Sequence, residues 1–271
     1  MGTTARPLQQ HNANNFQLRK WYADCITDSG DTVIAYFAFA RWSKISLYYS
    51  CVLRLLGDQP PCAQYSVRRS AEPVFDGATL HWKSPAFRFE GIWKTIDPSH
   101  SETVFSSERG TVEWNCFQPR ADVGVCFGEN QLRGLGYSEQ LVMTIPPWEI
   151  PIQHLLWGRF LSDMDSLVWM DWRGPFSKRV LLHNGARLIG GEVTHERIIL
   201  EAGQELTFSG SVVLRQGALG SAALQKIPGA KRLLPRQILG VQETKWRSRA
   251  QLSKSTGLSR GWAIHESVVW P

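Results

Sequence analysis

The sequence predicts an all-β protein, and three observations lead to that prediction. Short runs rich in Val, Ile, Tyr, Phe and Trp recur at spacings of about 8–12 residues and are separated by Gly, Pro, Asp or Ser. A helical period of about 3.6 residues is nowhere sustained. The 12 tryptophans are spread from Trp21 to Trp270, so aromatic side chains can reach a core along the whole chain. Many short strands of this kind are typical of β-sandwiches and β-barrels.

The first half of the chain is a succession of strand-like runs. The first two flank the turn DSGD at 28–31, and two β-rich runs around a short Gly-containing turn predict a hairpin. The Pro pair at 60–61 ends the third run, because proline cannot donate to a strand ladder. We expect strands at 20–27, 32–42, 44–56, 62–69, 79–84, 87–93, 111–119 and 122–127.

The second half continues in the same way. Turn residues at 184–185 (Asn-Gly) and 202–203 (Ala-Gly) indicate two further hairpins. The segment 221–235 is the least strand-like part of the chain, and we expect a short helix or a crossing loop there. We expect strands at 141–145, 155–160, 167–174, 179–193, 197–202, 206–216, 241–253 and 261–271.

Two segments resemble each other and indicate internal duplication. GYSEQLVM at 136–143 and GWAIHESV at 261–268 both begin with Gly and an aromatic residue, and both place a Glu in a strand. Each half also has about the strand number of one small barrel. The residue pattern by itself leaves one large domain or two smaller ones open.

The stretch 134–174 concentrates aromatic and ionisable side chains at alternate positions of three strand-like runs. Side chains two residues apart share one face of a strand. The three faces carry Tyr137, Glu139, Leu141 and Met143; Leu155, Trp157, Arg159 and Leu161; and Leu167, Trp169, Asp171 and Arg173. Buried charges are costly unless they are paired, so such faces indicate either a structural ion pair or a working pocket.

The net charge of +6 is unevenly distributed. Between residues 225 and 260 the only acid is Glu243, against Lys226, Lys231, Arg232, Arg236, Lys245, Arg247, Arg249, Lys254 and Arg260. Such a patch can meet nucleic acid or an anionic membrane surface, or it can be an ordinary solvated face. Because no nucleic-acid-binding motif is present, we expect no nucleic-acid partner and keep peripheral contact with an anionic membrane as an alternative.

Cysteine usage and the N-terminus bear on the compartment. The five cysteines form no CxxC pair, and the first 20 residues lack the apolar core of a signal peptide. No apolar run reaches the ~18–20 residues needed to span a bilayer. We therefore expect a cytoplasmic protein with reduced thiols. The histidines show no metal-binding spacing, so we expect neither a metal nor a cofactor.

Three segments carry recognisable motifs: KWYADCITDSGDTVIAYF at 20–37, GLGYSEQL at 134–141, and WGRFLSDMDSLVWMDWRG at 157–174. In these segments the chain resembles the lipocalin-like proteins related to carotenoid 1,2-hydratase (hydroxyneurosporene synthase) and the AttH-like proteins. The resemblance implies two lipocalin-like antiparallel β-barrel or sandwich domains in tandem, with an active site between or within them. It places a flexible leader at 1–19, an N-terminal domain at 20–132 and a C-terminal domain at 133–271.

The chain departs from this family at residues associated with adding water to an isoprenoid double bond. The family's mid-chain Asp corresponds to Glu139, but its histidine position is Gln140 and its Trp position is Val142. The family's later Tyr-x-Asp pair becomes Trp169 and Asp171. The resemblance therefore implies an acid in an aromatic pocket rather than strict carotenoid hydratase activity.

An acid in such a pocket has a chemical use. Protonating an alkene, or guiding a polyene through cyclisation, needs a carboxylic acid that stays protonated near neutral pH, and desolvation beside Trp favours that form. Indole faces then stabilise a developing carbocation by about 0.5–2 kcal/mol per contact. Asp171 beside Trp169, and Glu139, are therefore the candidate catalytic residues. The candidate substrate-binding residues are Tyr137, Trp157, Arg159, Trp169, Arg173, His265 and Glu266.

Neighbouring charges and strand geometry limit which of these residues can act in one pocket. Arg159 or Arg173 beside Asp171 would hold its carboxylate ionised and give it a structural role. Neighbouring residues face opposite sides of a strand, so only one of His265 and Glu266 can line a given pocket.

Three functions agree with these observations. The first is a cofactor-independent lyase, isomerase or cyclase acting on a large isoprenoid or polyketide-like substrate. The second is a carrier of a hydrophobic ligand, since barrels of this kind enclose apolar cavities. For a carrier, the substitutions Asp171→Asn and Glu139→Gln would leave ligand binding intact. The third is a module that contacts proteins or membranes through the basic segment, with binding that weakens as salt increases.

Overall fold

The structure is a computed structural model that describes residues 16–201, 203–218 and 236–271. Its first part forms one antiparallel sheet in the order β4-β3-β2-β1-β10-β9-β7-β6-β5, with β8 paired to β9. The strands of this sheet are β1 (Phe16–Ile26), β2 (Thr32–Trp42), β3 (Ile45–Leu55), β4 (Cys62–Ser66), β5 (Val74–Phe75), β6 (Thr79–Ser84), β7 (Phe89–Thr95), β8 (His100–Ser107), β9 (Gly110–Phe127) and β10 (Asn130–Met143).

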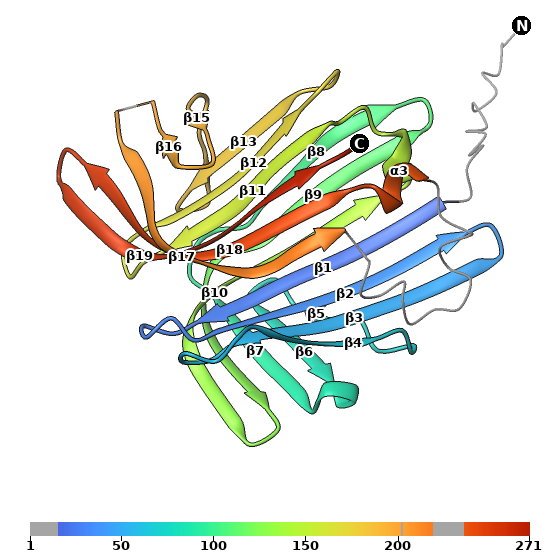
Figure 1. The fold of residues 1–271 in the computed structure, drawn as a ribbon, viewed down its shortest axis with the longest axis horizontal. Coiled ribbons are helices and arrows are strands. Elements are labelled where there is room, and N and C mark those ends of the chain that lie inside the picture. Colours follow the sequence, from blue (N-terminus) through green and yellow to red (C-terminus); the bar gives the residue numbers. More distant parts are fainter. Residues whose placement is uncertain (1–15, 202, 219–235) are drawn as a thin grey trace, which may run out of the picture.

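A second sheet lies against the first, above it in Figure 1, in the order β14-β13-β12-β11-β19-β18-β17-β16-β15. Its strands are β11 (His154–Leu161), β12 (Ser166–Arg173), β13 (Lys178–His183), β14 (Ala186–Arg187), β15 (Glu192–Val193), β16 (Arg197–Ile199), β17 (Glu205–Ala218), β18 (Gln242–Lys254) and β19 (Gly257–Val269). The described chain adds only two 3-10 turns, η1 (Pro85–Phe87) and η2 (Pro147–Glu149), and the short helix α3 (Arg236–Leu239). The all-β prediction is confirmed.

The second sheet repeats the strand order of the first. In each sheet the first strand, β1 or β11, pairs with the next strand along the chain and also with the last strand, β10 or β19. The two similar segments identified in the sequence lie in β10 and β19, which therefore occupy equivalent places. The two-unit architecture implied by the family resemblance is thus present in the fold.

The change from one sheet to the other falls between Met143 and His154. The boundary expected at 132/133 falls inside β10, which pairs with β9 from Asn130 to Met143 and with β1 from Leu135 to Met143. The division of the chain into domains at that position stays a prediction. The start of β1 at Phe16 also takes residues 16–19 out of the expected leader, while 1–15 and the segment 221–235 lie outside the described residues.

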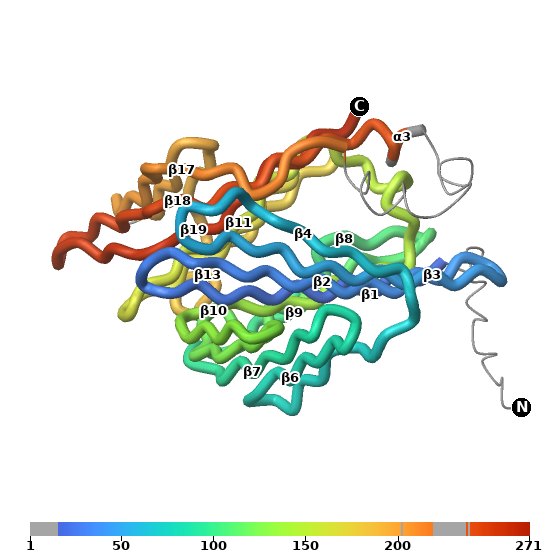
Figure 2. Tube along the Cα trace, turned by 60° about the horizontal axis from the view of Figure 1, so that its bottom comes forward, coloured from blue at the N-terminus to red at the C-terminus, as the bar shows by residue number. Residues whose placement is uncertain are grey.

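Three hydrophobic cores hold the sheets. The first sheet curls around its own core, which contains Trp21 and Trp93, and the second around a core that contains Trp169. A third core, shared by both sheets, contains Tyr22 and Trp157. Alternation along a strand explains this division, because successive side chains such as those at 21 and 22 face opposite sides. Figure 2 shows the first sheet curling from β4 past β1 to β7, beneath β17–β19.

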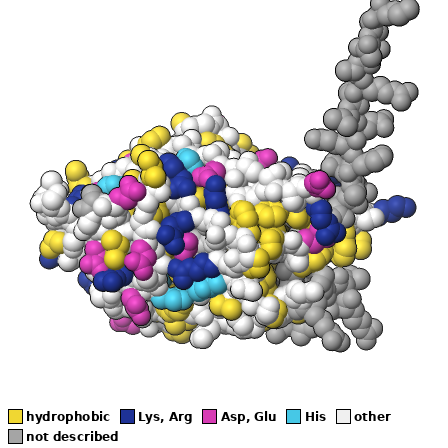
Figure 3. All heavy atoms as spheres, turned by 90° about the horizontal axis from the view of Figure 1, so that it is seen from above, with side chains coloured by type: hydrophobic (Ala, Val, Ile, Leu, Met, Phe, Trp, Pro, Cys, Tyr) yellow, Lys and Arg dark blue, Asp and Glu magenta, His cyan; other side chains and the backbone are white. Residues whose placement is uncertain are grey.

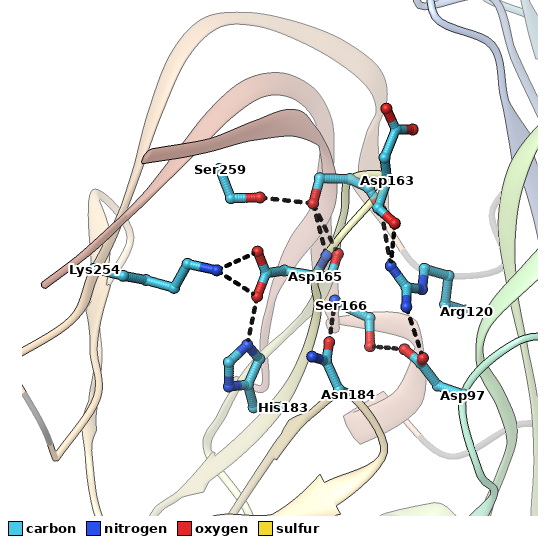
Figure 4. Close-up of polar contacts among 10 residues, drawn as sticks. Asp97, Arg120, Asp163, Asp165, Ser166, His183, Asn184, Lys254 and Ser259 are labelled. Carbon is cyan, nitrogen blue, oxygen red and sulfur yellow. Dashed lines mark hydrogen bonds and ion pairs between the residues drawn. The ribbon is translucent and has the colours of Figure 1, made fainter. Parts of the chain in front are cut away.

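Polar contacts join the sheets at one end, where β11 turns into β12 (Figure 4). Arg120 Nη1 donates to the carbonyl oxygens of Ser162 at 3.2 Å and Asp163 at 2.7 Å. Arg120 Nη2 binds Asp97 Oδ1 at 2.9 Å, and the other oxygen of Asp97 accepts from Ser166 Oγ at 2.5 Å. These bonds tie a turn of the second sheet to residues of the first.

The same turn is fixed from the other side by Asp165. Its Oδ1 contacts His183 Nε2 at 2.9 Å, and Lys254 Nζ lies 2.7 Å from Oδ2 (Figure 4). Ser162 Oγ contacts Ser259 Oγ at 2.7 Å and accepts from the backbone N–H of Asp165. The charged groups of this cluster are paired with one another, so we interpret the cluster as structural: Asp165 holds the turn within the second sheet, and Arg120 with Asp97 joins that turn to the first.

A second contact between the sheets involves the first hairpin turn. Arg247 Nη1 donates to the carbonyl oxygen of Gly30 at 2.7 Å, and Trp262 Nε1 donates to that of Asp28 at 3.2 Å. Gly30 has φ +92°, and a Cβ there would lie 2.6 Å from Trp262 Cζ2. The turn therefore needs glycine for both its conformation and its close approach to the second sheet.

The five cysteines are all free thiols, three of them buried. Among the described residues, no helix is long and apolar enough to cross a membrane.

Candidate functional site

A pocket of about 380 Å³ lies between the two sheets, on the shared core. Strands of both sheets build it, and most of its lining is apolar. The apolar lining includes Leu18, Leu141, Met143, Ile152, Leu155, Trp172, Val268 and Trp270, and the polar lining includes Lys20, Tyr36, Tyr49, Arg215, Glu243 and Glu266. Two other hollows, of about 420 and 440 Å³, have mixed or polar linings. Of these three hollows in the described chain, the inter-sheet pocket is the one suited to a hydrophobic molecule.

Three charged residues of the lining, together with Lys245 that pairs with one of them, form the polar floor of this pocket. The register of the second sheet places Arg215 of β17 opposite Lys245 of β18, and Lys245 opposite Glu266 of β19. Arg215 Nη2 contacts both oxygens of Glu243 at 2.5 and 2.7 Å, and Lys245 Nζ forms an ion pair with Glu266 Oε2. We call Arg215, Glu243, Lys245 and Glu266 the charged floor.

Lys245 is buried to an unusual degree for an ammonium group, with 1% exposure. Its Nζ lies 4.9 Å from the ring centroid of Trp157 and 5.3 Å from that of Tyr22, distances at which cation–π attraction stabilises the charge. Burial raises the pKa of Glu266, but the positive charges of Lys245, Lys20 and Arg215 together lower it below its usual value. Glu266 therefore presents an ionised carboxylate to an otherwise apolar pocket at neutral pH.

Glu139 sits in a cage of three hydrogen-bond donors behind this floor. Its Oε2 accepts from Trp114 Nε1 at 2.6 Å, from Tyr137 Oη at 2.7 Å and from Trp157 Nε1 at 3.2 Å. Trp157 thus links two sites, because its indole N–H binds Glu139 while its ring faces Lys245. The structure brings together the sequence-predicted residues Tyr137, Glu139 and Trp157, and it places Glu266 at the nearby pocket floor.

Arg159 lies beside this cluster but does not line the pocket. It forms a two-point ion pair with Asp24, and both side chains have 0% exposure. Tyr22 Oη also donates to Asp24, at 2.9 Å. The sequence-predicted role of Arg159 in substrate binding therefore gains no support from its position, which is that of a buried structural pair.

Asp171 occupies the opposite face of β12. Met170 and Trp172 face the shared core, whereas Trp169 belongs to the second sheet's own core. Asp171 Oδ2 accepts from Arg173 Nε at 2.7 Å and Oδ1 from Arg179 Nε at 2.9 Å. Asp171 and Arg173 therefore form the structural ion pair that was one of the two sequence readings, and Asp171 does not share a cavity with Glu139.

His265 also faces away from the inter-sheet pocket. Its ring stacks on Phe208 at 4.5 Å and on Trp246 at 5.3 Å, and Nε2 contacts Ser248 Oγ at 2.9 Å. Burial lowers the pKa of His265 to about 4, so the ring is neutral near pH 7. As strand alternation requires, Glu266 and not His265 reaches the pocket.

Arg215, Glu243 and Lys245 of the charged floor are absent from the site residues predicted from the sequence. Glu243 and Lys245 are two residues apart in β18, and both are almost fully buried. This spacing was the available signal, because it places an acid and a base on one face of a predicted strand. The large excess of basic residues in 225–260 obscures this alternation of an acid and a base, because the segment looks like a single basic patch.

The described part of the basic segment is not one continuous surface. Lys245 is buried, Arg247 binds the Gly30 carbonyl oxygen and Lys254 pairs with Asp165. Figure 3 shows Lys and Arg side chains interspersed with Asp and Glu on the face it presents. Lys226, Lys231 and Arg232 lie outside the described residues, and contact with a membrane stays a prediction. No group of three or more His, Cys, Asp or Glu residues in the described chain is arranged to hold a metal ion.

The arrangement of two curled sheets is the lipocalin-like fold of the AttH-like proteins. A protein assigned as AttH from Nitrosomonas europaea has the same fold, with a TM-score of 0.53, 11% identity and 97% coverage of both chains. CghA matches with a TM-score of 0.57 and 10% identity over 93% of this chain and 88% of its own. Kievitone hydratase from Nectria haematococca matches with a TM-score of 0.56 and 9% identity over 97% and 90%.

These likenesses confirm the fold that the family resemblance implied. At such low identities they show the fold alone, and a fold of this kind can carry different chemistries. No protein-family model matches the sequence, and no curated protein matches it. The residues of the inter-sheet pocket are therefore the basis for any assignment of activity.

Proposed function

We propose that this chain is a cofactor-independent enzyme of the hydratase, isomerase or cyclase type that binds a large hydrophobic molecule between its two sheets. One observation carries the proposal: an apolar pocket of about 380 Å³ ends on the ionised carboxylate of Glu266, which is held by the buried Lys245. Buried ion pairs seldom improve stability over apolar side chains, so a buried pair at a pocket floor is a candidate for chemistry.

Glu266 is the proposed general base. It accepts a proton either from a substrate carbon beside an electron-withdrawing group or from a water molecule that adds to the substrate. Returning that proton to another carbon completes an isomerisation, and delivering it to the carbon next to the new C–O bond completes a hydration. Lys245 positions the carboxylate and stabilises its charge through a contact that the pocket wall shields from solvent.

Glu139 takes a positioning role in this proposal. Trp and Tyr donors already occupy its Oε2, and it does not line the pocket. By holding the indole N–H of Trp157, it fixes the ring that faces Lys245. The sequence-based assignment of Glu139 as the catalytic acid is thus replaced by an indirect role, and that of Asp171 by a structural one.

The related structures support a small-molecule substrate. Kievitone hydratase is by name a hydratase, and CghA has also been solved together with Sch210972. Both share the fold of this chain, which supports a hydratase-like or cyclase-like activity without identifying the substrate.

A carrier of a hydrophobic ligand is the second candidate, because the apolar pocket alone would serve it. The two candidates differ over Glu266. A carrier needs the cavity but no base, so Glu266→Gln should leave a carrier's function intact.

Native mass spectrometry of the freshly purified protein, followed by organic extraction, is the first test. A co-purifying hydrophobic compound, or its product, then becomes the substrate for turnover assays. Glu266→Gln should reduce turnover by about 10²–10⁴-fold, the usual loss for a general base. Asp171→Asn is the matched control and should retain turnover.

A second variant separates catalysis from folding. Combining Glu266→Gln with Lys245→Met leaves no unpaired ammonium in the core, so a loss of activity in both variants reflects the missing base. Unchanged turnover in Glu266→Gln would rule out this mechanism, and binding without any turnover by wild-type protein would favour the carrier.

A further inference from the structure

Three aromatic residues that line the inter-sheet pocket each carry a hydrogen-bond donor without a partner in the part of the chain that the structure describes. These donors are Tyr36 Oη, Trp172 Nε1 and Trp270 Nε1; the Nε of Arg215, another lining residue, is also without a partner there. Tyr36 is only 4% exposed and Trp172 only 6%. Most buried polar groups in folded proteins are paired, so three such donors around one cavity call for an explanation.

The donors come from both walls of the pocket. Tyr36 lies on β2 of the first sheet, Trp172 lies on β12 of the second, and Trp270 directly follows β19. Burial raises the pKa of the Tyr36 phenol well above its usual value, so it keeps its proton and donates. The indole N–H groups can only donate. Each donor atom has less than 1 Å² exposed, so it borders the pocket and becomes accessible only when its side chain shifts. A molecule that then satisfies these donors must supply acceptors.

One lining cation is available to a bound molecule. Arg215 is paired with Glu243, and Glu266 with Lys245, which does not itself line the pocket. Lys20 has no ion pair among the described residues, although its charge helps to lower the pKa of Glu266, and its ammonium lies 6.0 Å from the ring centroid of Tyr36. An anionic or carbonyl oxygen beside Lys20 would therefore find a cation that no carboxylate contacts directly.

We propose that the molecule bound in this pocket is an apolar compound that carries acceptor oxygens on two sides, such as ketone and carboxylate groups, and is not a pure hydrocarbon. This inference rests on the proposed function of the same site. A hydrocarbon would fill the cavity but keep all three donors from water, and each unmet donor weakens binding. Oxygens facing Tyr36 and Lys20 on one wall, and Trp172 on the other, would satisfy them.

The substrate class is narrower than the sequence suggested. The sequence left isoprenoid and polyketide-like molecules equally open, but an unoxygenated polyene fits the lining poorly. Within the proposed activity, a ketone would also acidify the neighbouring carbon, whose proton the Glu266 carboxylate could then accept.

Three rigid probes of nearly equal shape test this inference: fluorene, fluorenone and fluorenone carboxylate, which carry no acceptor group, one and two. Isothermal titration calorimetry on the full chain would measure their dissociation constants under one buffer and cosolvent condition. We expect fluorenone carboxylate and fluorenone to bind about tenfold or more tightly than fluorene, as expected for one satisfied buried donor.

Tyr36→Phe should remove most of this preference while leaving the affinity for fluorene within about twofold, since only a hydroxyl is lost. Lys20→Met should selectively weaken fluorenone carboxylate. Tyr48→Phe is the matched control, because Tyr48 lies in another hollow against Phe39 and should change none of the three affinities.

The outcomes separate this inference from the proposed function. If fluorene bound as tightly as both oxygenated probes, the substrate class would be wrong while the pocket remained a hydrophobic binding site. If none of the probes bound up to its solubility limit, the pocket would not be a site for such molecules, and the proposed function would fall with the inference. A preference that survived Tyr36→Phe and Lys20→Met unchanged would also contradict the assignment.

Discussion

The guanidinium group of Arg159 on β11 donates two hydrogen bonds to the carboxylate of Asp24 on β1, at 2.9 and 3.1 Å, and neither side chain is exposed. These are the first strands of the two sheets, so the pair joins the sheets at equivalent places. Removing one member of a buried pair leaves the other charge without compensation, which costs far more than the intact pair contributes.

Arg159→Met should therefore lower the free energy of unfolding by about 3–5 kcal/mol. Adding Asp24→Asn removes the stranded charge but still lets Tyr22 donate to residue 24, so the double variant should be more stable than Arg159→Met alone. Urea unfolding of the wild type and the three variants measures the cycle. A double variant no more stable than Arg159→Met would show that the ion pair is not what links the sheets here.

Tyr36→Phe should stabilise the ligand-free protein, by about 1 kcal/mol, because it removes a buried hydroxyl that has no partner in the described chain. Thermal and urea unfolding without added ligand would detect the change. The same substitution is expected to weaken binding of oxygenated probes, and opposite effects on stability and binding are typical of residues kept for function. Destabilisation by Tyr36→Phe would mean that its hydroxyl is satisfied in the free protein.

Glu139→Gln should lower the free energy of unfolding by about 1–2 kcal/mol, because three hydrogen bonds to a charged oxygen become bonds to a neutral one. Glu139→Ala should cost clearly more, since it leaves the donors of Trp114, Tyr137 and Trp157 without an acceptor. Urea unfolding of both variants gives the order. Equal losses of stability in Glu139→Gln and Glu139→Ala would show that Glu139 does not accept the hydrogen bonds of these three donors.

Asp171→Asn should cost only about 1 kcal/mol, because its partners Arg173 and Arg179 are both partly exposed to solvent. The affinity for fluorenone carboxylate should not change, since Asp171 faces away from the pocket. Calorimetric titration of the variant checks the second point. A severalfold weaker affinity would place Asp171 in communication with the site after all.

His265 makes stability depend on pH. The pKa of its ring is lowered to about 4, first by burial and then by Lys245. An unfolded histidine has a pKa of about 6.5, so between these values the unfolded chain binds a proton that the folded protein does not. Stability should therefore fall as the pH is lowered from about 6.5 to about 4, by on the order of 3 kcal/mol in total.

His265→Gln provides the comparison for this pH effect. Its unfolding free energy should change less than that of the wild type between about pH 7 and pH 4.5, when both are measured in urea. Carboxylates that titrate in the same range affect both proteins and cancel in the difference. Parallel pH profiles would exclude His265 as the source.

The strand prediction succeeded for most of the chain because the local signals agree there. It missed β8 (His100–Ser107) and most of β10 (Asn130–Met143), and it divided β9 (Gly110–Phe127) into two strands. Alternation, β-branched and aromatic residues, and Gly- or Pro-containing turns all indicate strands, and the turn at 28–31 does join β1 to β2. The grouping of Tyr137 with Glu139, and of Trp157 with Arg159, followed correctly from the period of two.

The alternation of side chains does not predict which of the three hydrophobic cores each face of a strand packs against. In β12 every residue from Ser166 to Trp172 is buried, so hydrophobicity does not distinguish its two faces. The sequence therefore leaves open whether Asp171 and Glu139 share one cavity, and in the structure Asp171 lies on the other side of the sheet, beside Arg173 and Arg179. Pairings such as Asp24 with Arg159, 135 residues apart, depend on how the sheets pack and leave no local trace in the sequence.

The pairing of β11 with β19 also has a consequence for how the chain is made. On a ribosome, β1 to β10 emerge together and can close the first sheet before β12 exists. β11 must then wait for β19, the last strand of its sheet, with one backbone edge open to any other extended chain. Since long-range pairing is slow, this interval is when nascent chains are most exposed to mutual aggregation, and the half-finished second sheet is where a chaperone would be needed.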